Sequence, residues 1–355
     1  MKDYLSWLKK LLEIAILERA SDLHFVANYY PMIRVSDRLI PLVKEGRLTP
    51  QDSENLALSM MNPEQRDRFF KEKEIDFSYE YKEKARFRVN VFFQRGKISA
   101  ALRLIPPKIL TIEELNLPPI LHYFTKAAQG FVLITGASSQ GKSTTLASLI
   151  DEINHTRSEH IITIEDPIEY VFTPDKSIIE QREVGFDTLS FKKALKSVLR
   201  QDPDVIMVGE MRDPESISMA ITAAETGHLV FSTLHTNSAA QTIHRIVDSF
   251  PPEQQPQIRA QLSGSLLGVV SQRLIPRIKG GLIPACEVMI VTPAIANLIR
   301  EGKIHEIPLV IETSAKLGMI TLNRYLADLV KRGEITTENA LRFSLNPVEL
   351  KTLLR

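Results

Sequence analysis

A short glycine-bounded segment in the middle of the chain constrains the fold more than any other feature. Residues 136–143 read G-A-S-S-Q-G-K-S, which fits the pattern G-x-x-x-x-G-K-[ST]. The apolar run FVLIT at 131–135 precedes it, and a helical pattern follows from about Ser143. In such a strand, loop and helix, the backbone N–H groups of the loop and of the helix N-terminus face phosphate oxygens. We therefore expect a phosphate-binding loop within an α/β domain.

Each side chain of this loop has an expected part in binding a nucleotide. Lys142 supplies a positive charge to the β- and γ-phosphates, and the hydroxyl of Ser143 is offered to Mg²⁺. Many such loops have glycine where this chain has Ser139; if φ is positive there, serine costs about 1 kcal/mol relative to glycine. The residues expected to line the nucleotide are Gly136, Ala137, Ser138, Ser139, Gln140, Gly141, Lys142, Ser143 and Thr144.

Further apolar runs continue the α/β pattern on the C-terminal side of the loop. They are HIITIED (160–166), DVIMVG (204–209) and LVFSTLH (229–235), and helical stretches such as SFKKALKSVLR lie between them. Strands that alternate with helices predict a parallel sheet. From about residue 290 the pattern is mainly helical, in pieces that end at glycines.

Acidic residues stand at the ends of two predicted strands. Glu165 and Asp166 end the first, where a carboxylate can orient an attacking water; a loop-capping Asp166 is the structural alternative. Glu210 follows VIMVG, where a Walker B acid reaches Mg²⁺ directly or through water, although Gly209 replaces the usual Asp. An exposed carboxylate without a function is the alternative for Glu210.

Two histidines, His228 and His235, flank the strand pattern LVFSTLH. We expect them beside the same sheet edge, where they sense the γ-phosphate or contact a neighbouring subunit; ordinary core or surface histidines are the alternative. A metal pair is not favoured because no third ligand is apparent.

The first 105 residues carry a different pattern. Leu5, Leu8, Leu12 and Leu17 have helical spacing, and strand-like segments follow at 23–43 and 75–104 around a helix that begins at Thr49. Four prolines in 106–119 indicate a linker and a hinge. The sequence thus predicts an α+β domain at 1–105, a linker at 106–119 and an α/β domain at 120–355, mainly helical at 290–355.

Composition excludes several functional classes. The formal net charge of +1 gives no basis for a dedicated nucleic-acid-binding protein, and a translocase for nucleic acids is an unfavoured alternative. The single cysteine, Cys286, excludes an internal disulfide framework and a multi-cysteine zinc site, and suits the cytoplasm. The N-terminus does not read as a secretory signal, and no uncharged apolar run approaches the ~18 residues of a membrane span. We expect no direct membrane span.

Taken together, the motifs resemble a known family. GASSQGKSTT, ITIEDPIEY, DPDVIMVGEMRD and AAETGHLVFSTLHTNSA occur in the order of the Walker A, Asp, Walker B and His boxes of secretion-superfamily ATPases. ARFRVNVFFQRG, SQRLIPRI and KLGMITLNRYLADLVKRGEIT extend the similarity, over most of the chain, to the PilT-like retraction ATPases of type IV pili. The resemblance implies a PAS-like N-terminal domain, a RecA-like P-loop ATPase domain with a helical C-terminal part, and a homohexamer that uses ATP and Mg²⁺.

The resemblance also implies residue roles and partners. Glu165 would polarise the hydrolytic water, Glu210 would support Mg²⁺ with Ser143, and the two histidines would link nucleotide state to neighbouring contacts. Arg88 and Arg103 would face the phosphates. The implied partners are further copies of the chain and the inner-membrane pilus platform protein, on the cytoplasmic face of the inner membrane. The implied work is pilin disassembly, which underlies twitching motility.

Two departures from the family pattern concern rate and coupling. Ser139 and Gln140 are unusual in the loop and favour slow turnover, so an accessory nucleotide-binding ring subunit is the alternative function. The retraction signature A-I-R-x-G-E is only partly met, since Ala296 occupies the position of its arginine. A tetracysteine zinc site and a longer N-terminal extension, both typical of pilus assembly ATPases, are expected to be missing here, which favours the retraction type.

Overall fold

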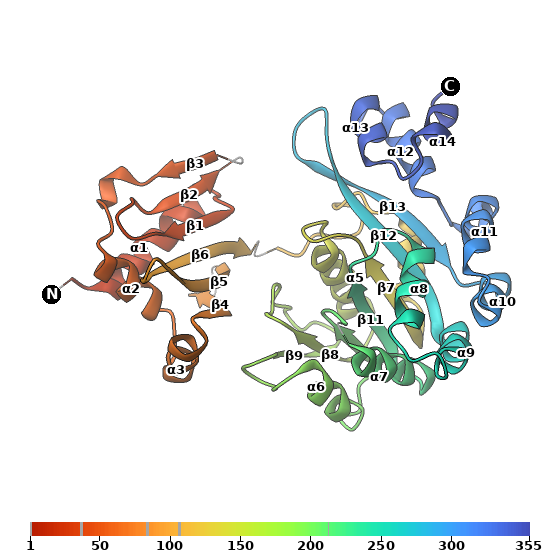
Figure 1. Ribbon diagram of the computed structural model, residues 1–355, viewed down its shortest axis with the longest axis horizontal. Coiled ribbons are helices and arrows are strands. Elements are labelled where there is room, and N and C mark those ends of the chain that lie inside the picture. Colours follow the sequence, from red (N-terminus) through yellow and green to blue (C-terminus); the bar gives the residue numbers. More distant parts are fainter. Residues whose placement is uncertain (1, 36–37, 83–84, 106–107, 212) are drawn as a thin grey trace. The chain divides into compact units, whose positions relative to one another are not determined.

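The computed structural model describes residues 2–35, 38–82, 85–105, 108–211 and 213–355. They form two compact units (Figure 1). The first unit contains residues 1–108 together with the segment 166–171, and the second contains residues 109–165 and 172–355. Of the predicted linker, Pro106 and Pro107 lie outside the described residues, and 109–119 belongs to the second unit.

A six-stranded antiparallel sheet organises the first unit, with the strand order β3-β2-β1-β6-β5-β4. Its strands are β1 (Asp22–Phe25), β2 (Met32–Val35), β3 (Arg38–Pro41), β4 (Glu74–Tyr81), β5 (Ala85–Gln94) and β6 (Lys97–Ile105). Its helices are α1 (Tyr4–Leu17), the 3₁₀ turn η1 (Val43–Glu45), α2 (Pro50–Leu58) and α3 (Pro63–Glu72). The predicted mixture of helices and strands is confirmed. The pattern missed α3, in which only Phe69 is buried.

Alternation along the strands gives this sheet one apolar face and one polar face. In β5, Phe87, Val89 and Val91 are buried while the residues between them are partly exposed. Helix α1 packs on the apolar face through Leu8, Leu11, Leu12 and Ala15. The predicted apolar face of α1 was shifted, because Leu5 and Leu17 are 46% and 81% exposed.

Helix α2 begins where the sequence predicted. The Thr49 hydroxyl accepts a hydrogen bond from the Asp52 N–H at 3.1 Å, and the Asp52 carboxylate accepts one from the Thr49 N–H at 2.9 Å. This reciprocal capping box satisfies two backbone donors at the helix start.

The second unit is built on a seven-stranded sheet with the order β13-β12-β7-β11-β10-β8-β9. All neighbours are parallel except the hairpin pair β12 and β13. The strands are β7 (Gly130–Thr135), β8 (His160–Glu165), β9 (Ile178–Glu183), β10 (Val205–Val208), β11 (Leu229–Leu234), β12 (Leu266–Pro276) and β13 (Leu282–Ile290). The four strands predicted from apolar runs are confirmed, and they are the four central ones. Their residues are buried on both faces, as in parallel sheets covered by helices.

Helices follow the strands and pack on the sheet. Helices α5 and α7 contact the central strands β7 and β11, and α8 contacts β12 and β13. The helices up to this point are η2 (Pro119–Leu121), α4 (His122–Thr125), α5 (Lys142–Thr156), α6 (Phe191–Val198), α7 (Pro214–Glu225), α8 (Ala239–Asp248) and α9 (Gln255–Ser265).

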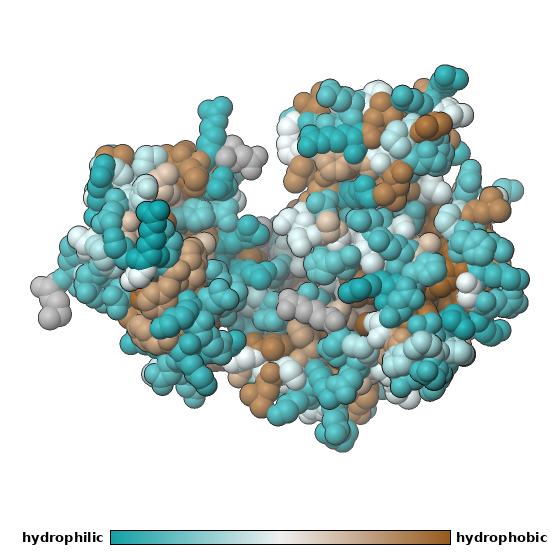
Figure 2. All heavy atoms as spheres, in the orientation of Figure 1, coloured by the Kyte–Doolittle hydropathy of each residue, from teal (hydrophilic) through white to brown (hydrophobic). Residues whose placement is uncertain are grey.

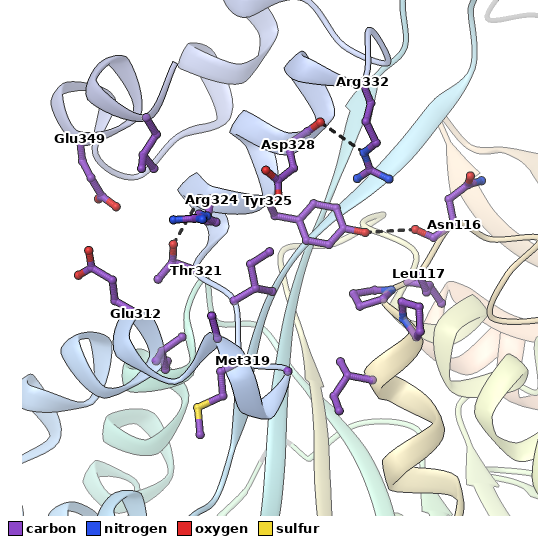
Figure 3. Close-up of a pocket in the computed structure, with 18 residues that line it drawn as sticks. Asn116, Leu117, Glu312, Met319, Thr321, Arg324, Tyr325, Asp328, Arg332 and Glu349 are labelled. Atoms are coloured by element: carbon purple, nitrogen blue, oxygen red, sulfur yellow. Dashed lines mark hydrogen bonds between the residues drawn. The ribbon is translucent and has the colours of Figure 1, made fainter. Parts of the chain in front are cut away.

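The C-terminal part consists of short helices around the β12–β13 hairpin. They are α10 (Pro293–Glu301), η3 (Ile304–Glu306), α11 (Ile307–Thr313), η4 (Ala315–Leu317), α12 (Leu322–Lys331), α13 (Thr337–Phe343) and α14 (Pro347–Leu353). A cavity of about 650 Å³ lies between these helices and the segment Asn116–Ile120 (Figure 3). The Tyr325 hydroxyl points across it and donates to the Asn116 carbonyl at 3.3 Å. Of the described residues that line this cavity, none belongs to the phosphate loop.

On the face shown in Figure 2, apolar side chains occur singly or in small groups among hydrophilic ones. Within the described part of the chain, no helix combines the length and hydrophobicity required to cross a membrane.

Candidate active site

Most of the predicted functional residues of the second unit converge at the carboxyl ends of its parallel strands. Strands β7, β11, β10 and β8 lie side by side in that order, and their last pairs run from Thr135–Leu234 to Val208–Ile164. Because all four strands are parallel, the residues at their carboxyl ends meet at the same end of the sheet. These residues are the phosphate loop, His235, Gly209, Glu210 and Glu165.

Backbone conformation explains the glycines of the phosphate loop and the cost of its serine. Gly136 (φ 149°) passes so close to β12 that a Cβ would lie 2.5 Å from the Gln272 carbonyl oxygen. Gly141 (φ 76°) is the N-cap of α5. Ser139 has φ 62°, a left-handed conformation that favours glycine, so the predicted strain is confirmed.

Lys142 lies at the start of α5 and is only 8% exposed. Its ammonium donates to the carbonyl oxygens of Gly136 and Ala137, at 2.9 and 2.8 Å. These bonds hold the Lys142 ammonium against the first two residues of the loop. Ser143, one residue later, is exposed.

Glu165 ends β8 and is 7% exposed. Its Oε1 accepts hydrogen bonds from the Thr163 hydroxyl at 2.6 Å and from the Gln181 amide of β9 at 3.1 Å. Both donors come from strands, so the carboxylate is oriented by rigid elements. Asp166, the next residue, belongs to the first unit.

Close packing explains why glycine, and not the usual aspartate of the Walker B pattern, occupies position 209. A Cβ at this position would lie 3.3 Å from the Ile164 carbonyl oxygen and 3.5 Å from the Cα of Glu165. The Gly209 N–H also donates to that carbonyl at 2.8 Å. A side chain here would press on the strand that carries Glu165.

Glu210 and His235 lie together at the carboxyl ends of β10 and β11. The Nε2 of His235 is 3.5 Å from the Glu210 carboxylate. His228 lies elsewhere, because it precedes β11 whereas His235 follows it, and a six-residue strand separates their backbones by roughly 20 Å. The Nδ1 of His228 lies 2.9 Å from the Ala223 carbonyl. The expectation of two histidines at the same edge is therefore corrected, since only His235 is there.

Arg88 and Arg103 lie on the polar face of the first unit, directly opposite one another across β5 and β6. Arg103 pairs with Asp22 at 3.2 Å, and Arg88 pairs at 3.3 Å with Glu169. Glu169 comes from the segment 166–171, which Arg86 also holds through the Ile168 carbonyl at 3.2 Å. Each of the two facing arginines thus has a carboxylate partner, which offsets the repulsion between them.

Sequence reasoning missed one polar residue next to the loop, Gln272 of β12. It is 3% exposed and hydrogen-bonds to both Gln140 and Thr145. Its only signal in the sequence was its place in SQRLIPRI, since an amide has no motif of its own.

Comparison with known proteins identifies the family of this chain. A sequence model of the family described as type II/IV secretion system protein matches residues 4–312. The chain belongs to this family. It is 49% identical to the type IV pilus retraction ATPase PilT of Pseudomonas aeruginosa, over 93% of this chain and 96% of that protein. It is 45% identical to a twitching motility protein of Neisseria gonorrhoeae, over 95% and 90% of the two chains.

A solved structure of the pilus retraction motor PilT with bound ADP superimposes with a TM-score of 0.91 and 48% identity. It covers 97% of this chain and 98% of that one. The chain is thus a PilT-like secretion ATPase, and its mixed α/β fold with two sheets is the fold of that relative.

Proposed function

We propose that this PilT-like ATPase works as a homohexameric motor in which hydrolysis of ATP to ADP and phosphate drives type IV pilus retraction. One observation carries the proposal. Lys142, Glu165, Glu210 and His235 converge on the carboxyl edge of one parallel sheet, beside a loop with the backbone of a phosphate cradle. A nucleotide on Gly136–Thr144 would have its phosphates at the N-terminus of α5, where N–H groups and the helix dipole favour negative charge.

The donor set fits Mg²⁺. The exposed hydroxyl of Ser143 and the carboxylate of Glu210 are oxygen ligands of the kind that Mg²⁺ accepts beside phosphates. When bound, the ion neutralises charge on the phosphates. His235 lies close enough to Glu210 to respond to a change in that carboxylate.

Glu165 is proposed to polarise the attacking water. Thr163 and Gln181 bond to one of its two oxygens, Oε1, and fix the direction in which the carboxylate faces. A carboxylate held in this way orients a water without reorganising during the reaction.

Arg88 and Arg103 are proposed to stabilise charge on the transferred phosphoryl group, with the N-terminal unit as a PAS-like carrier. Their facing positions support this role, because two neighbouring guanidinium groups can both donate hydrogen bonds to one phosphoryl group. The hinge at 106–119 would let the carrier move during turnover. His228, away from the sheet edge, is proposed to contact a neighbouring subunit.

The proposed partners are further copies of the chain and the inner-membrane pilus platform protein, on the cytoplasmic side of the inner membrane. Two relatives, a pilus retraction ATPase of Pseudomonas and a twitching motility protein of Neisseria, support a role in the pilus machine.

Replacement of Lys142 by Ala tests the site. ATPase activity should fall by at least about 100-fold, because the charge on the phosphates is lost. Lys126→Ala removes an exposed lysine after α4 and should keep full activity. Chelation of Mg²⁺ with EDTA should abolish ATP turnover in the unchanged protein and in Lys126→Ala. Unchanged ATPase activity in Lys142→Ala would show that the site is wrongly assigned.

The alternative function, an accessory ring subunit, draws support from the strain at Ser139. Tight nucleotide binding by a hexamer with no release of phosphate would favour it over the motor.

A further inference from the structure

Strand β12 extends past the end of its neighbour β7. The parallel pairing of the two strands ends at Ser271 and Thr135, whereas β12 remains paired with β13 as far as Pro276. At this point β7 leaves the sheet as the phosphate loop (Figure 1). The edge of β12 from Gln272 to Leu274 therefore faces the loop where a strand would otherwise be.

The Gln272 side chain joins the second half of the phosphate loop to the first turn of α5. Its Nε2 donates to the Gln140 carbonyl at 2.8 Å, and its Oε1 accepts from the Thr145 hydroxyl at 2.7 Å. A carbonyl can only accept, so the orientation of the amide is fixed. Gln140 precedes the N-cap of α5 and Thr145 lies in its first turn, so the N–H groups of residues 141–144, at the start of the helix, lie between the two contacts.

The Gln140 side chain in turn contacts the backbone of β12. Its Oε1 accepts a hydrogen bond from the Leu274 N–H at 2.7 Å, which satisfies a β12 donor that β7 no longer reaches. The Gln272 backbone takes part as well, because its carbonyl lies against Gly136. The unusual glutamine of the loop is thus one half of a reciprocal pair of amides.

We propose that Gln272 is a positioning residue for nucleotide binding, which holds the phosphate loop in its binding shape through Gln140 and Thr145. Gln140 supports it through Leu274. The proposal rests on the assignment of the loop as the ATP site. The expected phenotype of its loss is weaker nucleotide binding, since the bonded groups lie in the cradle and away from the water-polarising Glu165.

Gln272→Met is the first test, because methionine keeps the length of the side chain and removes both hydrogen bonds. The affinity of the full-length protein for a fluorescent ATP analogue should fall about ten-fold, as expected for two buried hydrogen bonds. The KM for ATP should rise similarly, while kcat at saturating ATP stays within about three-fold. Gln272→Glu, which keeps the acceptor for Thr145 and loses the donor to Gln140, should bind at least as weakly.

Gln261→Met is the matched control, since it removes a surface amide of α9 that bonds to Glu225, and its affinity should equal that of the unchanged protein. Gln140→Ser removes only the contact to Leu274 and should weaken binding less than Gln272→Met. The double variant Gln272→Met with Gln140→Ser should show less than the sum of the two effects, because both belong to one pair.

Affinities within two-fold of the unchanged protein in both Gln272 variants would overturn the proposal. A lower thermal midpoint of the nucleotide-free protein with unchanged affinity would also overturn it, since that result indicates a purely structural residue. Failure of the underlying function looks different, because the unchanged protein would then neither bind the ATP analogue nor release phosphate.

Discussion

At the scale of single residues, the phosphate loop has a strained backbone at Ser139. Ser139 adopts φ 62° and the adjacent Ser138 does not have a positive φ. Ser139→Gly should therefore raise the free energy of unfolding by about 0.5–1 kcal/mol, because glycine has no Cβ to strain in this region. Urea unfolding of the nucleotide-free protein measures this.

Ser138→Gly is the control for that change. It adds backbone freedom to the unfolded chain without relieving strain, so it should leave stability unchanged or lower it. Equal effects of the two substitutions would contradict the account of a strained loop.

Gly209 offers a second prediction at the residue scale. Gly209→Ala should lower kcat about ten-fold or more, because its Cβ would press on Ile164 and displace the strand that ends in Glu165. Nucleotide affinity should change little, since the phosphate loop is two strands away. Steady-state kinetics with a binding assay separate the two effects.

Gly264→Ala provides the comparison, because it lies in helix α9 with nothing within 4 Å of an added Cβ. It should keep full activity and gain up to about 1 kcal/mol of stability. Full activity of Gly209→Ala would refute the packing explanation of the Walker B departure.

At the scale of elements, the sequence predicted the central strands of the second unit better than its edges. Strands β7, β8, β10 and β11 are apolar runs because both of their faces are buried. β9 is an edge strand, with Ile178 exposed and polar residues along its length, so its sequence contains no apolar run that would predict a strand. β12 follows α9 without an intervening turn residue, and Pro284 lies within β13, although proline in a sequence argues against a strand.

The same limits apply to the candidate site. Lys142, Glu165, Glu210 and His235 were predictable, because charged residues at strand ends follow known motifs. The reciprocal amides of Gln140 and Gln272 were not, since they meet only once β12 is placed beside β7 in the sheet. The prediction for His228 was wrong because His228 and His235, although close in sequence, lie at opposite ends of the extended strand β11.

A titratable contact joins helices α4 and α5 to Glu113 in the segment 109–119. The ring nitrogens of His122 lie 2.8 Å from Glu152 and 2.7 Å from Glu113. The hydrogen bond to Glu152, followed by that to Glu113, raises the pKa of His122 against the opposing effect of burial. This stabilisation is fully present below the unfolded pKa of about 6.5 and is lost as the pH rises through the higher folded pKa.

His122→Gln should therefore cost about 1 kcal/mol of unfolding free energy at pH 6 and much less at pH 9. Chemical unfolding of both proteins across this range measures the difference. A cost that is equal at both pH values would show that the charge on His122 does not contribute.

The polar face of the N-terminal sheet carries a prediction about charge. Arg103→Ala should change the stability of this unit by less than about 0.5 kcal/mol, because the loss of the exposed ion pair with Asp22 and the loss of repulsion from Arg88 oppose each other. It should lower kcat by about 100-fold or more if the arginine meets the transferred phosphoryl group. Arg38→Ala, on the exposed strand β3, is the control and should change neither quantity. Unchanged kcat in Arg103→Ala would remove this arginine from the site.

At the scale of the whole molecule, one chain carries two units of different chemistry. The second unit has the phosphate loop, the acids and His235, and the first has the facing arginines and the segment 166–171 that directly follows Glu165. Under the proposed function, catalysis would use groups from both units.

The ATPase rate per subunit, measured across protein concentrations together with the mass in solution, tests the central claim most directly. The account predicts phosphate release that rises as the hexamer forms and stays constant once all of the protein is hexameric. A stable hexamer that binds ATP and releases no phosphate at any concentration would contradict it.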